Sequence, residues 1–402
     1  MFKLYCRLYQ SIMKVGMNFI KWKKPEMISG ENSTDKIPEI LKEKGIDTVL
    51  VVTDKGIVNL KLHENLLKVL KDNKIKYFLY DKTVPNPTIA NIEEGVNIYK
   101  ENNCAGIITI GGGSPMDCAK GIGARIANPN KTITKMRGLL KVKNKLPLLI
   151  AIPTTAGTGS ETTVAAVITD GDTHEKYAIN DPKLVPDYAV LDPKLTLSLP
   201  ASLTATTGMD ALTHAVEAYI GNSNTKETKQ NAVMAVKLIF RNLSKAVKNG
   251  GDVEARENMQ KAAFMAGVAF TRAYVGNVHS LAHALGGEYS VPHGLANAIL
   301  LPRVLEFYGK SIYKKIYKLC DEAEILTIHK NPKERCEAFI ARIDEMNKNF
   351  DIPTYIDAIK KADLNKLAKR AYKESNPLYP VPKIMSVKDF EKIYDDLLIN
   401  KY

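Results

Sequence analysis

Cysteine is scarce in this chain of 402 residues, where it occurs only at positions 6, 104, 118, 320 and 336. The number is odd and no C-x-x-C spacing occurs, which argues against a disulfide framework and against a zinc site built from cysteine. The chain also lacks an apolar run of the roughly 20 residues that a bilayer crossing requires. These absences favour a reducing compartment, and we expect a cytoplasmic protein without stable membrane insertion.

Acidic residues are outnumbered, since 57 Lys and Arg against 44 Asp and Glu give a net charge of +13. A basic balance is compatible with nucleic acid, an anionic membrane or an acidic ligand. The lysines are dispersed, however, and no RNA-binding aromatic signature or zinc-finger spacing accompanies them. We therefore interpret the charge as a solvated surface and expect no nucleic-acid partner. A basic binding protein with an inherited catalytic fold remains the alternative, which salt-dependent retention on DNA or anionic lipid would favour.

Residues 1–35 form a basic N-terminal extension ahead of the first predicted strand. Its first 24 residues mix apolar side chains with Lys3, Arg7, Lys14, Lys21, Lys23 and Lys24. Such a mixture is typical of an amphipathic surface helix or of a targeting segment. Because a clean apolar core and a small-residue cleavage site are both missing, we predict a helix that packs on the protein.

Residues 36–198 alternate short apolar runs with helical patterns. We expect strands at Asp47–Thr53, Lys76–Tyr80, Gly106–Ile110 and Leu146–Ile152, and helices at Asn59–Asn73 and Ile89–Asn102. Buried strands that alternate with helices indicate a Rossmann-like α/β domain, with a parallel sheet covered on both faces.

Residues 199–402 have a different texture, in which strand-like runs nearly vanish. The helix candidates are Asp210–Tyr219, Lys226–Asn249, Asp252–Ala269, His279–Gly286 and Leu295–Tyr308. The segment Asp192–Pro200 carries two prolines and is a plausible boundary. We therefore predict an α/β domain followed by an all-helical domain.

A run of three glycines, Gly111-Gly112-Gly113, follows the strand Gly106–Ile110. The next residues predict a helix start, with Ser114 as N-cap and Asp117 completing an S-x-x-D capping box. A helix N-terminus behind a flexible glycine turn is an anion site suited to a pyrophosphate. The run lacks the G-x-G-x-x-G spacing, so a plain strand-to-helix turn stays equally compatible with it.

A second loop of small residues, Pro153-Thr-Thr-Ala-Gly-Thr-Gly-Ser-Glu161, follows the strand Leu146–Ile152. Its hydroxyls and backbone N–H groups are suited to a ribose or phosphate. Two such loops at neighbouring strand ends support each other, because ligands of open α/β sheets lie at the carboxyl ends of strands. Asp54 also follows a strand, where a carboxylate either binds a ribose diol or caps a helix.

Four of the seven histidines lie between positions 214 and 293. Asp210 and His214 stand at i and i+4, as do His279 and His283, and His293 follows a proline. Residues at i and i+4 share a helix face and can hold one ion. Three imidazoles and a carboxylate suit Fe²⁺ or Zn²⁺, although spacing alone leaves open which histidines bind. The remaining ones, His63, His174 and His329, lack this context.

The motifs GGGSPMD, PTTAGTGSE, GMDALTHAVEAYI and HSLAHALGGEYSVPHGLANAILLP together resemble the iron-containing alcohol dehydrogenase family. The resemblance runs from about Lys36 to beyond Pro302. It implies a dinucleotide-binding N-terminal domain, a helical metal-binding C-terminal domain and an active site in the cleft between them. It also implies NAD and Fe²⁺ as cofactors, with Zn²⁺ as the alternative metal, and a homodimer or larger assembly.

The resemblance further implies roles for individual residues. The metal-ligand positions are Asp210, His214, His279 and His293. His283 falls on a non-ligand histidine near the substrate. The cofactor positions are Asp54, Asn86, Gly112, Gly113, Ser114, Asp117, Thr154, Thr155, Thr158, Thr163 and Lys176. In the family, an acidic residue at the position of Asp54 accompanies the use of NAD rather than NADP.

Two departures from the family pattern stand out: the long basic leader, and Ala165 where some diol-acting members carry a polar side chain. We expect hydride transfer between NAD(H) and a small primary alcohol or aldehyde, with His283 relaying the hydroxyl proton. The alternatives are a dehydroquinate synthase-like enzyme, which needs a Lys/Arg cluster near the metal, and a glycerol dehydrogenase-like enzyme. A purely structural zinc is disfavoured because such sites are rich in cysteine.

Overall fold

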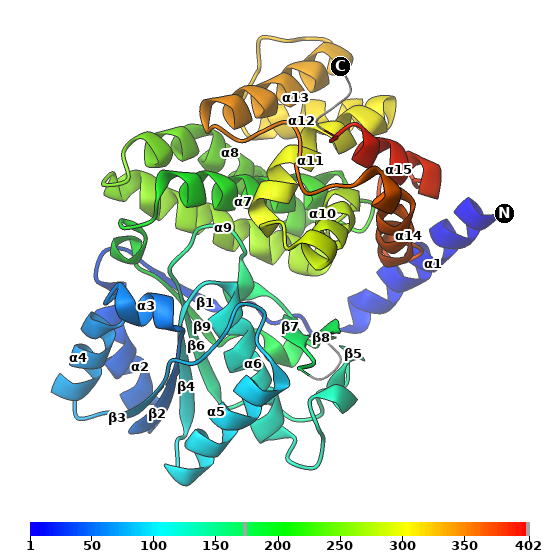
Figure 1. Ribbon diagram of the computed structural model, residues 1–402. Coiled ribbons are helices and arrows are strands. Elements are labelled where there is room, and N and C mark those ends of the chain that lie inside the picture. Colours follow the sequence, from blue (N-terminus) through cyan, green and yellow to red (C-terminus); the bar gives the residue numbers. More distant parts are fainter. Residues whose placement is uncertain (172–174, 399–402) are drawn as a thin grey trace. The chain divides into compact units, whose positions relative to one another are not determined.

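The chain folds into two compact units in the computed structural model, which describes residues 1–171 and 175–398 (Figure 1). One unit comprises Lys21–Ser198, and the other joins Met1–Ile20 to Leu199–Tyr402. The segment 1–35, which the sequence groups as one extension, is therefore divided. Its first twenty residues belong to the helical unit and the remainder to the sheet unit.

The sheet unit is built on six parallel strands in the order β1-β9-β6-β4-β2-β3. Their bounds are β1 (Glu26–Ser29), β2 (Thr48–Val52), β3 (Lys76–Tyr80), β4 (Gly106–Gly111), β6 (Leu148–Pro153) and β9 (Tyr188–Leu191). The predicted parallel sheet and its four expected strands are confirmed. Sequence patterns missed β1 and β9, because a four-residue strand is too short to show a period.

Two separate hydrophobic cores cover the two faces of this sheet. Successive side chains of a strand point to opposite faces, and in β2 Leu50 and Val52 join one core while Val49 and Val51 join the other. Helices α5 (Ile89–Glu101) and α6 (Gly113–Ala127) complete the first core. Helices α2 (Ile37–Glu43) and α4 (Glu64–Asp72) complete the second. The expectation of a sheet buried on both faces is confirmed.

The helix expected at Asn59–Asn73 is wrong in its extent. Two helices occur instead, α3 (Lys55–Asn59) and α4, separated by a turn in which Lys61 has a φ of 58°. A left-handed residue ends an α-helix because the following N–H no longer points along the axis. A small second sheet also escaped prediction. It has the order β5-β8-β7 and consists of β5 (Gly138–Leu139), β7 (Ala165–Thr169) and β8 (Lys176–Asn180).

The regular elements of the second unit are helices, and its described residues contain no strand. Its main helices are α7 (Ala201–Ile220), α8 (Lys226–Lys248), α9 (Val253–Ala273), α10 (Asn277–Tyr289), α11 (His293–Tyr308), α12 (Tyr313–Glu322), α13 (Pro332–Asn349), α14 (Leu364–Ser375) and α15 (Val387–Asp395). Small residues allow close packing: a Cβ on Gly208 of α7 would lie 2.3 Å from Cδ1 of Leu243 in α8. The predicted helical domain is confirmed.

Helix α1 (Phe2–Gly16) packs on this helical unit, as expected of the N-terminal segment. The Arg7 guanidinium donates to the carbonyls of Val381 and Pro382, at 2.7 and 2.9 Å. The Gln10 amide donates to the Pro377 and Tyr379 carbonyls. Within 1–171 and 175–398, no helix has the length and apolar character needed to cross a membrane.

Candidate functional site

Three helices of the second unit bring four potential metal ligands together. Helix α7 supplies Asp210 and His214, one turn apart, α10 supplies His279, and α11 begins at His293. Their four ligand atoms all lie within 4.8 Å of one another. The structure therefore clusters the same Asp and three His that the resemblance implied.

The spacing of these atoms fits a single ion. Oδ1 of Asp210 lies 3.4 Å from Nε2 of His293 and 3.9 Å from both Nδ1 of His214 and Nε2 of His279. Four donors placed about 2.1 Å from a tetrahedral metal are separated by about 3.4 Å. The donor set, imidazole nitrogen with one carboxylate oxygen, suits Fe²⁺ or Zn²⁺. The residues present thus fit a divalent transition metal.

His279 and His293 are held in the neutral form that a metal requires. Burial lowers the pKa of His279 well below its ordinary value, and the neighbouring histidines lower it further. Burial also lowers the pKa of His293 to about 4, although the Asp210 carboxylate partly offsets this. Imidazole binds a metal through the lone pair of its neutral form. Both imidazoles are therefore uncharged at neutral pH and carry the lone pair that a metal binds.

Glu217 is a buried partner of the cluster that sequence reasoning missed. Its carboxylate lies 2.7 Å from Nδ1 of His279 and also accepts hydrogen bonds from the backbone N–H groups of Gly276 and Val278, both at 2.8 Å. A carboxylate on the distal ring nitrogen fixes the tautomer and orientation of a metal-binding imidazole. The signal was present, because Glu217 stands three residues after His214 and seven after Asp210 on one helix face.

Asn297, one turn after His293 in α11, is a second missed residue. It is fully buried, and its amide nitrogen donates to Oδ1 of Asp210 at 2.7 Å. The same nitrogen lies 3.2 Å from Nε2 of His279 and 3.1 Å from Nε2 of His293. Asn297 is therefore in contact with three of the four candidate ligands, and it limits the space around them.

His283 lies beside the cluster but outside it. Its ring is 5.2 Å from that of His293 and 5.8 Å from that of His279. Nδ1 of His283 forms a 2.7 Å contact with Glu374, and the half-exposed ring leaves its other side to solvent. Burial lowers the pKa of His283, but the Glu374 carboxylate outweighs it and the net shift is upward. This placement suits a proton relay, and the catalytic role of His283 stays a prediction.

The candidate nucleotide loops lie at the carboxyl edge of the six-stranded sheet. Strands β4 and β6 are neighbours, with Gly111 paired to Pro153, and the Thr154 N–H donates to the Gly111 carbonyl at 3.0 Å. A Cβ on Gly112 would lie 3.9 Å from the Thr155 side chain. The expectation that the two loops lie side by side is confirmed.

The capping box predicted at Ser114 and Asp117 is wrong. Helix α6 already begins at Gly113, with Gly112 as N-cap and no side-chain cap. Gly111 turns the chain with a φ of 148°, which glycine adopts without a steric penalty, and the helix then starts before the serine. Its first N–H groups are consequently not capped by a side chain, which preserves the predicted anion site.

The polar residues of this turn instead join neighbouring segments. Oγ of Ser114 accepts from the Asn86 N–H at 3.3 Å, which brings two predicted cofactor residues together. Asp117 accepts from the Ser160 hydroxyl and from the Val167 N–H, both at 3.1 Å. Asp117 therefore fixes the second loop, and its predicted contact with the cofactor remains untested.

Lys120 holds the second loop through hydrogen bonds, a role that sequence reasoning missed. Its ammonium is fully buried and donates to the Ser160 carbonyl and the Thr163 hydroxyl, both at 2.7 Å, and to the Ala165 carbonyl at 2.9 Å. Burial lowers the pKa of Lys120 to about 8, while Asp117 and Glu161 oppose the shift. Burial also raises the pKa of Glu161 to about 7.

The remaining predicted cofactor residues lie around the same edge. Asp54 follows β2 and caps α3, accepting from the Ile57 N–H at 3.0 Å. Oγ1 of Thr158 accepts from the Ser160 N–H. Lys176 pairs with Thr169 in the small sheet, and the Thr169 N–H donates to the Pro87 carbonyl, next to Asn86. His174 lies outside the described residues.

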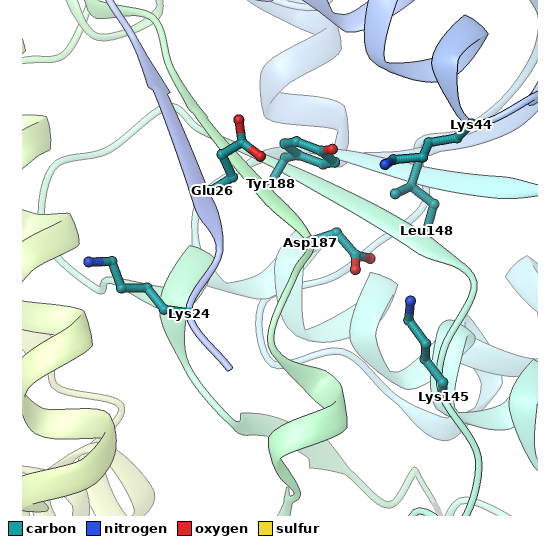
Figure 2. Close-up of a pocket in the computed structure, with 7 residues that line it drawn as sticks. All are labelled: Lys24, Glu26, Lys44, Lys145, Leu148, Asp187 and Tyr188. Carbon is teal, nitrogen blue, oxygen red and sulfur yellow. The ribbon is translucent and has the colours of Figure 1, made fainter. Parts of the chain in front are cut away.

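A pocket of about 430 Å³ lies elsewhere, at the amino ends of β1, β6 and β9 (Figure 2). It is lined by Lys24, Glu26, Lys44, Lys145, Leu148, Asp187 and Tyr188. None of the predicted site residues is among them. Parallel sheets bind nucleotides at their carboxyl edge, so this pocket is not the nucleotide site.

Comparisons with known proteins match both units. A family profile described as iron-containing alcohol dehydrogenase matches residues 24–193, and one described as the C-terminal part of the Fe-containing alcohol dehydrogenase family matches residues 204–398. The chain is 37% identical over 383 residues to the NAD-dependent methanol dehydrogenase of Bacillus methanolicus, covering 93% of this chain and 98% of that one.

Two further relatives extend this likeness. Alcohol dehydrogenase 4 of Schizosaccharomyces pombe is 41% identical over 348 residues, covering 85% of this chain and 81% of that one. The crystal structure of a 1,3-propanediol oxidoreductase superposes with a TM-score of 0.90 at 34% identity, covering 94% of this chain and all of that one. Both sequence and fold therefore lead to the same family.

Proposed function

The chain belongs to the iron-containing alcohol dehydrogenase family, and from this premise we propose that it transfers a hydride between NAD(H) and a small primary alcohol or aldehyde. The observation that carries the proposal is the cluster of Asp210 and three histidines, whose ligand atoms lie within 4.8 Å of one another. An all His and Asp set without cysteine is typical of a working metal rather than a structural one.

The metal would be held by Asp210, His214, His279 and His293. A divalent ion bound there supplies Lewis acidity, which lowers the pKa of an alcohol and polarises an aldehyde carbonyl. The chain's own contribution is orientation: Glu217 fixes the His279 ring, and Asn297 contacts Asp210. Buried and preorganised donors of this kind need no rearrangement during the reaction.

The nucleotide would be held at the carboxyl edge of the sheet. Gly112, Gly113 and Ser114 at the start of α6 would bind the pyrophosphate through backbone N–H groups. Asp54 would bind the ribose diol and disfavour a 2′-phosphate, which supports NAD over NADP. The nicotinamide half would contact Thr154, Thr155, Thr158, Thr163 and Lys176. Asn86 and Asp117 are the further predicted cofactor-binding residues. The hydride chemistry itself belongs to the cofactor.

His283 would move the hydroxyl proton. Its ring faces His279 and His293 on one side, and its Nδ1 is held by Glu374. Glu374 would steady the positively charged ring while a proton passes toward solvent. Replacing His283 with Ala should slow turnover while metal stays bound.

The substrate is proposed to be a monohydric alcohol or its aldehyde rather than a diol, because Ala165 offers no polar side chain at the start of β7. The chain's likeness to a 1,3-propanediol oxidoreductase makes 1,3-propanediol the natural comparison. A higher kcat/KM for short primary alcohols than for 1,3-propanediol would support this choice, and the reverse order would contradict it. We also propose that the protein is cytoplasmic and that it forms a homo-oligomer. Sedimentation analysis of the purified protein would test the oligomeric state.

The test is metal-dependent turnover. Protein reconstituted anaerobically with Fe²⁺ or Zn²⁺ is assayed with short alcohols and aldehydes through the near-ultraviolet absorbance of NADH, beside the His279→Ala variant. We expect turnover that requires both metal and His279. Protein that binds metal and NAD but turns over no alcohol or aldehyde would contradict the proposal and favour a non-redox, dehydroquinate synthase-like reaction.

A further inference from the structure

Helix α1 lies outside the part of the chain that the family profiles match. The match to the family begins at residue 24, whereas α1 spans Phe2–Gly16. The helix nevertheless packs with the helical unit, and its ribbon lies beside that of α14 (Figure 1). The Phe2 ring stacks on that of Tyr372 in α14, with centroids 5.5 Å apart. A segment that is added to the enzyme and held in place calls for a separate explanation.

The two faces of α1 differ sharply. The inner face is anchored by Cys6 and Gln10, which are both buried. The outer face is a stripe of large apolar side chains in open solvent, with exposed fractions of 74% for Leu4, 60% for Leu8 and 63% for Ile12. Residues four apart share one helix face, so these three stand in a row.

The stripe continues past the helix. Val15 is 59% exposed, and Phe19, in the short 3-10 helix Met17–Phe19, is 86% exposed. Scattered apolar residues on a surface need no explanation, but a contiguous row of five marks an interaction site. We call this row of Leu4, Leu8, Ile12, Val15 and Phe19 the α1 stripe.

The charged residues of the segment that carries the α1 stripe have one sign. The first acidic residue of the chain is Glu26, and six Lys and Arg precede it. Lys3 and Lys14 are exposed on α1 itself. An apolar helix face on a helix that carries exposed lysines and no acidic residue is complementary to an anionic lipid surface, where side chains enter the acyl boundary and lysines meet the headgroups.

We propose that α1 docks this protein peripherally on the surface of an anionic lipid bilayer through the α1 stripe. The helix lies in the plane of the interface, with Leu4, Leu8 and Ile12 buried among the acyl chains. It does not cross the bilayer, because fifteen helical residues span only about 22 Å. The proposal is independent of which alcohol the enzyme uses.

A second copy of the chain is the competing occupant. Two α1 helices that met through the α1 stripe across a two-fold axis would bring the exposed Lys3 and Lys14 of the two copies close together. No acidic residue on α1 would offset that repulsion. Charge complementarity therefore favours lipid headgroups over self-association.

The experiment uses the full chain and sedimentation with vesicles of phosphatidylcholine, with or without phosphatidylglycerol. We expect binding to the anionic vesicles only, and binding that weakens as salt rises from 0.1 to 0.5 M. The variant Leu8→Ser/Ile12→Ser should lower the partition coefficient more than tenfold. The variant Lys3→Glu/Lys21→Glu should lower it by about fivefold or more for each residue changed.

The matched control is Leu60→Ser/Ile328→Ser, which removes two apolar side chains that are about as exposed as Leu8 and Ile12 or more so, far from α1 in sequence. It should bind vesicles like the wild type, and circular dichroism should show unchanged helix content in every variant. No wild-type binding to anionic vesicles would overturn the proposal without requiring any variant. A wild-type dimer that Leu8→Ser/Ile12→Ser dissociates, with no vesicle binding, would assign the α1 stripe to a second copy instead.

Discussion

The metal cluster and the nucleotide loops are built in opposite ways. The cluster consists of long side chains on three rigid helices, with donors 3.4 to 3.9 Å from Asp210. The loops consist mainly of backbone, where glycines let a turn approach a ligand and buried side chains hold the turn from behind. A side-chain site depends on each of its ligands, whereas a backbone site depends on the few residues that fix its conformation.

The largest effect is expected from removing a ligand. His293→Ala should lower NADH-linked turnover by about three orders of magnitude or more and abolish stoichiometric metal binding. The loss of one ligand lowers the affinity for the metal ion, and a substrate that the metal no longer orients is misplaced for the reaction. Metal content by mass spectrometry and the rate together measure it.

His283→Ala is the matched control, since this ring lies beside the metal cluster, 5.2 Å from the His293 ring, but outside the ligand set. It should keep its metal. Metal loss in His283→Ala and retention in His293→Ala would reverse the assignment of the ligands.

A smaller loss is expected at Glu217, which acts on the metal only through His279. Glu217→Gln keeps the size of the side chain but removes the charge that orients the imidazole, so metal affinity should fall by about 10- to 100-fold. Competition with a chromophoric chelator measures the affinity.

The conservative change in a solvent-exposed acid of the next helix, Glu227→Gln, serves as control and should leave the affinity unchanged. An equal loss in both variants would indicate a general charge effect instead of a positioning role.

Removal of the buried Lys120 ammonium should weaken the nucleotide site and leave the metal site unchanged. Lys120→Met removes the donor that links Ser160, Thr163 and Ala165, so the loop should loosen and NAD affinity should fall by roughly tenfold. Metal content should stay at the wild-type level, because the metal ligands lie on other helices.

Fluorescence titration with NADH measures this change, with Lys100→Met at an exposed position as control. Weaker NADH binding accompanied by metal loss would mean that the two sites are not independently built.

The smallest expected effect is on the pH dependence of thermal stability, through Glu161. The folded-state pKa of Glu161 is raised to about 7 by burial, above its ordinary value of 4.5, so its contribution to stability is present below pH 4.5 and is lost as pH rises through 7. Glu161→Gln should therefore gain a few degrees in Tm relative to wild type between pH 5 and pH 8.

Thermal unfolding at both pH values gives this difference, and the exposed Glu101→Gln variant should show none. A constant difference between wild type and Glu161→Gln across this range would show that Glu161 keeps one charge state throughout.

Much of the fold could be predicted because its signals are local. The apolar run at positions 48–52 and the helical period of α8 each fit within one segment. A four-residue strand such as β9 is too short to show a period. The break between α3 and α4 at Lys61 depends on one backbone angle, which side-chain patterns do not report.

The sequence by itself determined the ligand pairs that lie one helical turn apart, the glycine turn and the change from an α/β to a helical texture. Each of these depends on spacing along the chain, which helix and strand geometry convert directly into shared faces and edges. Only the tertiary structure decided that Glu217 holds His279, that Asn297 contacts Asp210 and that Lys120 fixes the second loop. Those contacts join residues 40 to 87 positions apart, and burial, rather than sequence spacing, makes them strong.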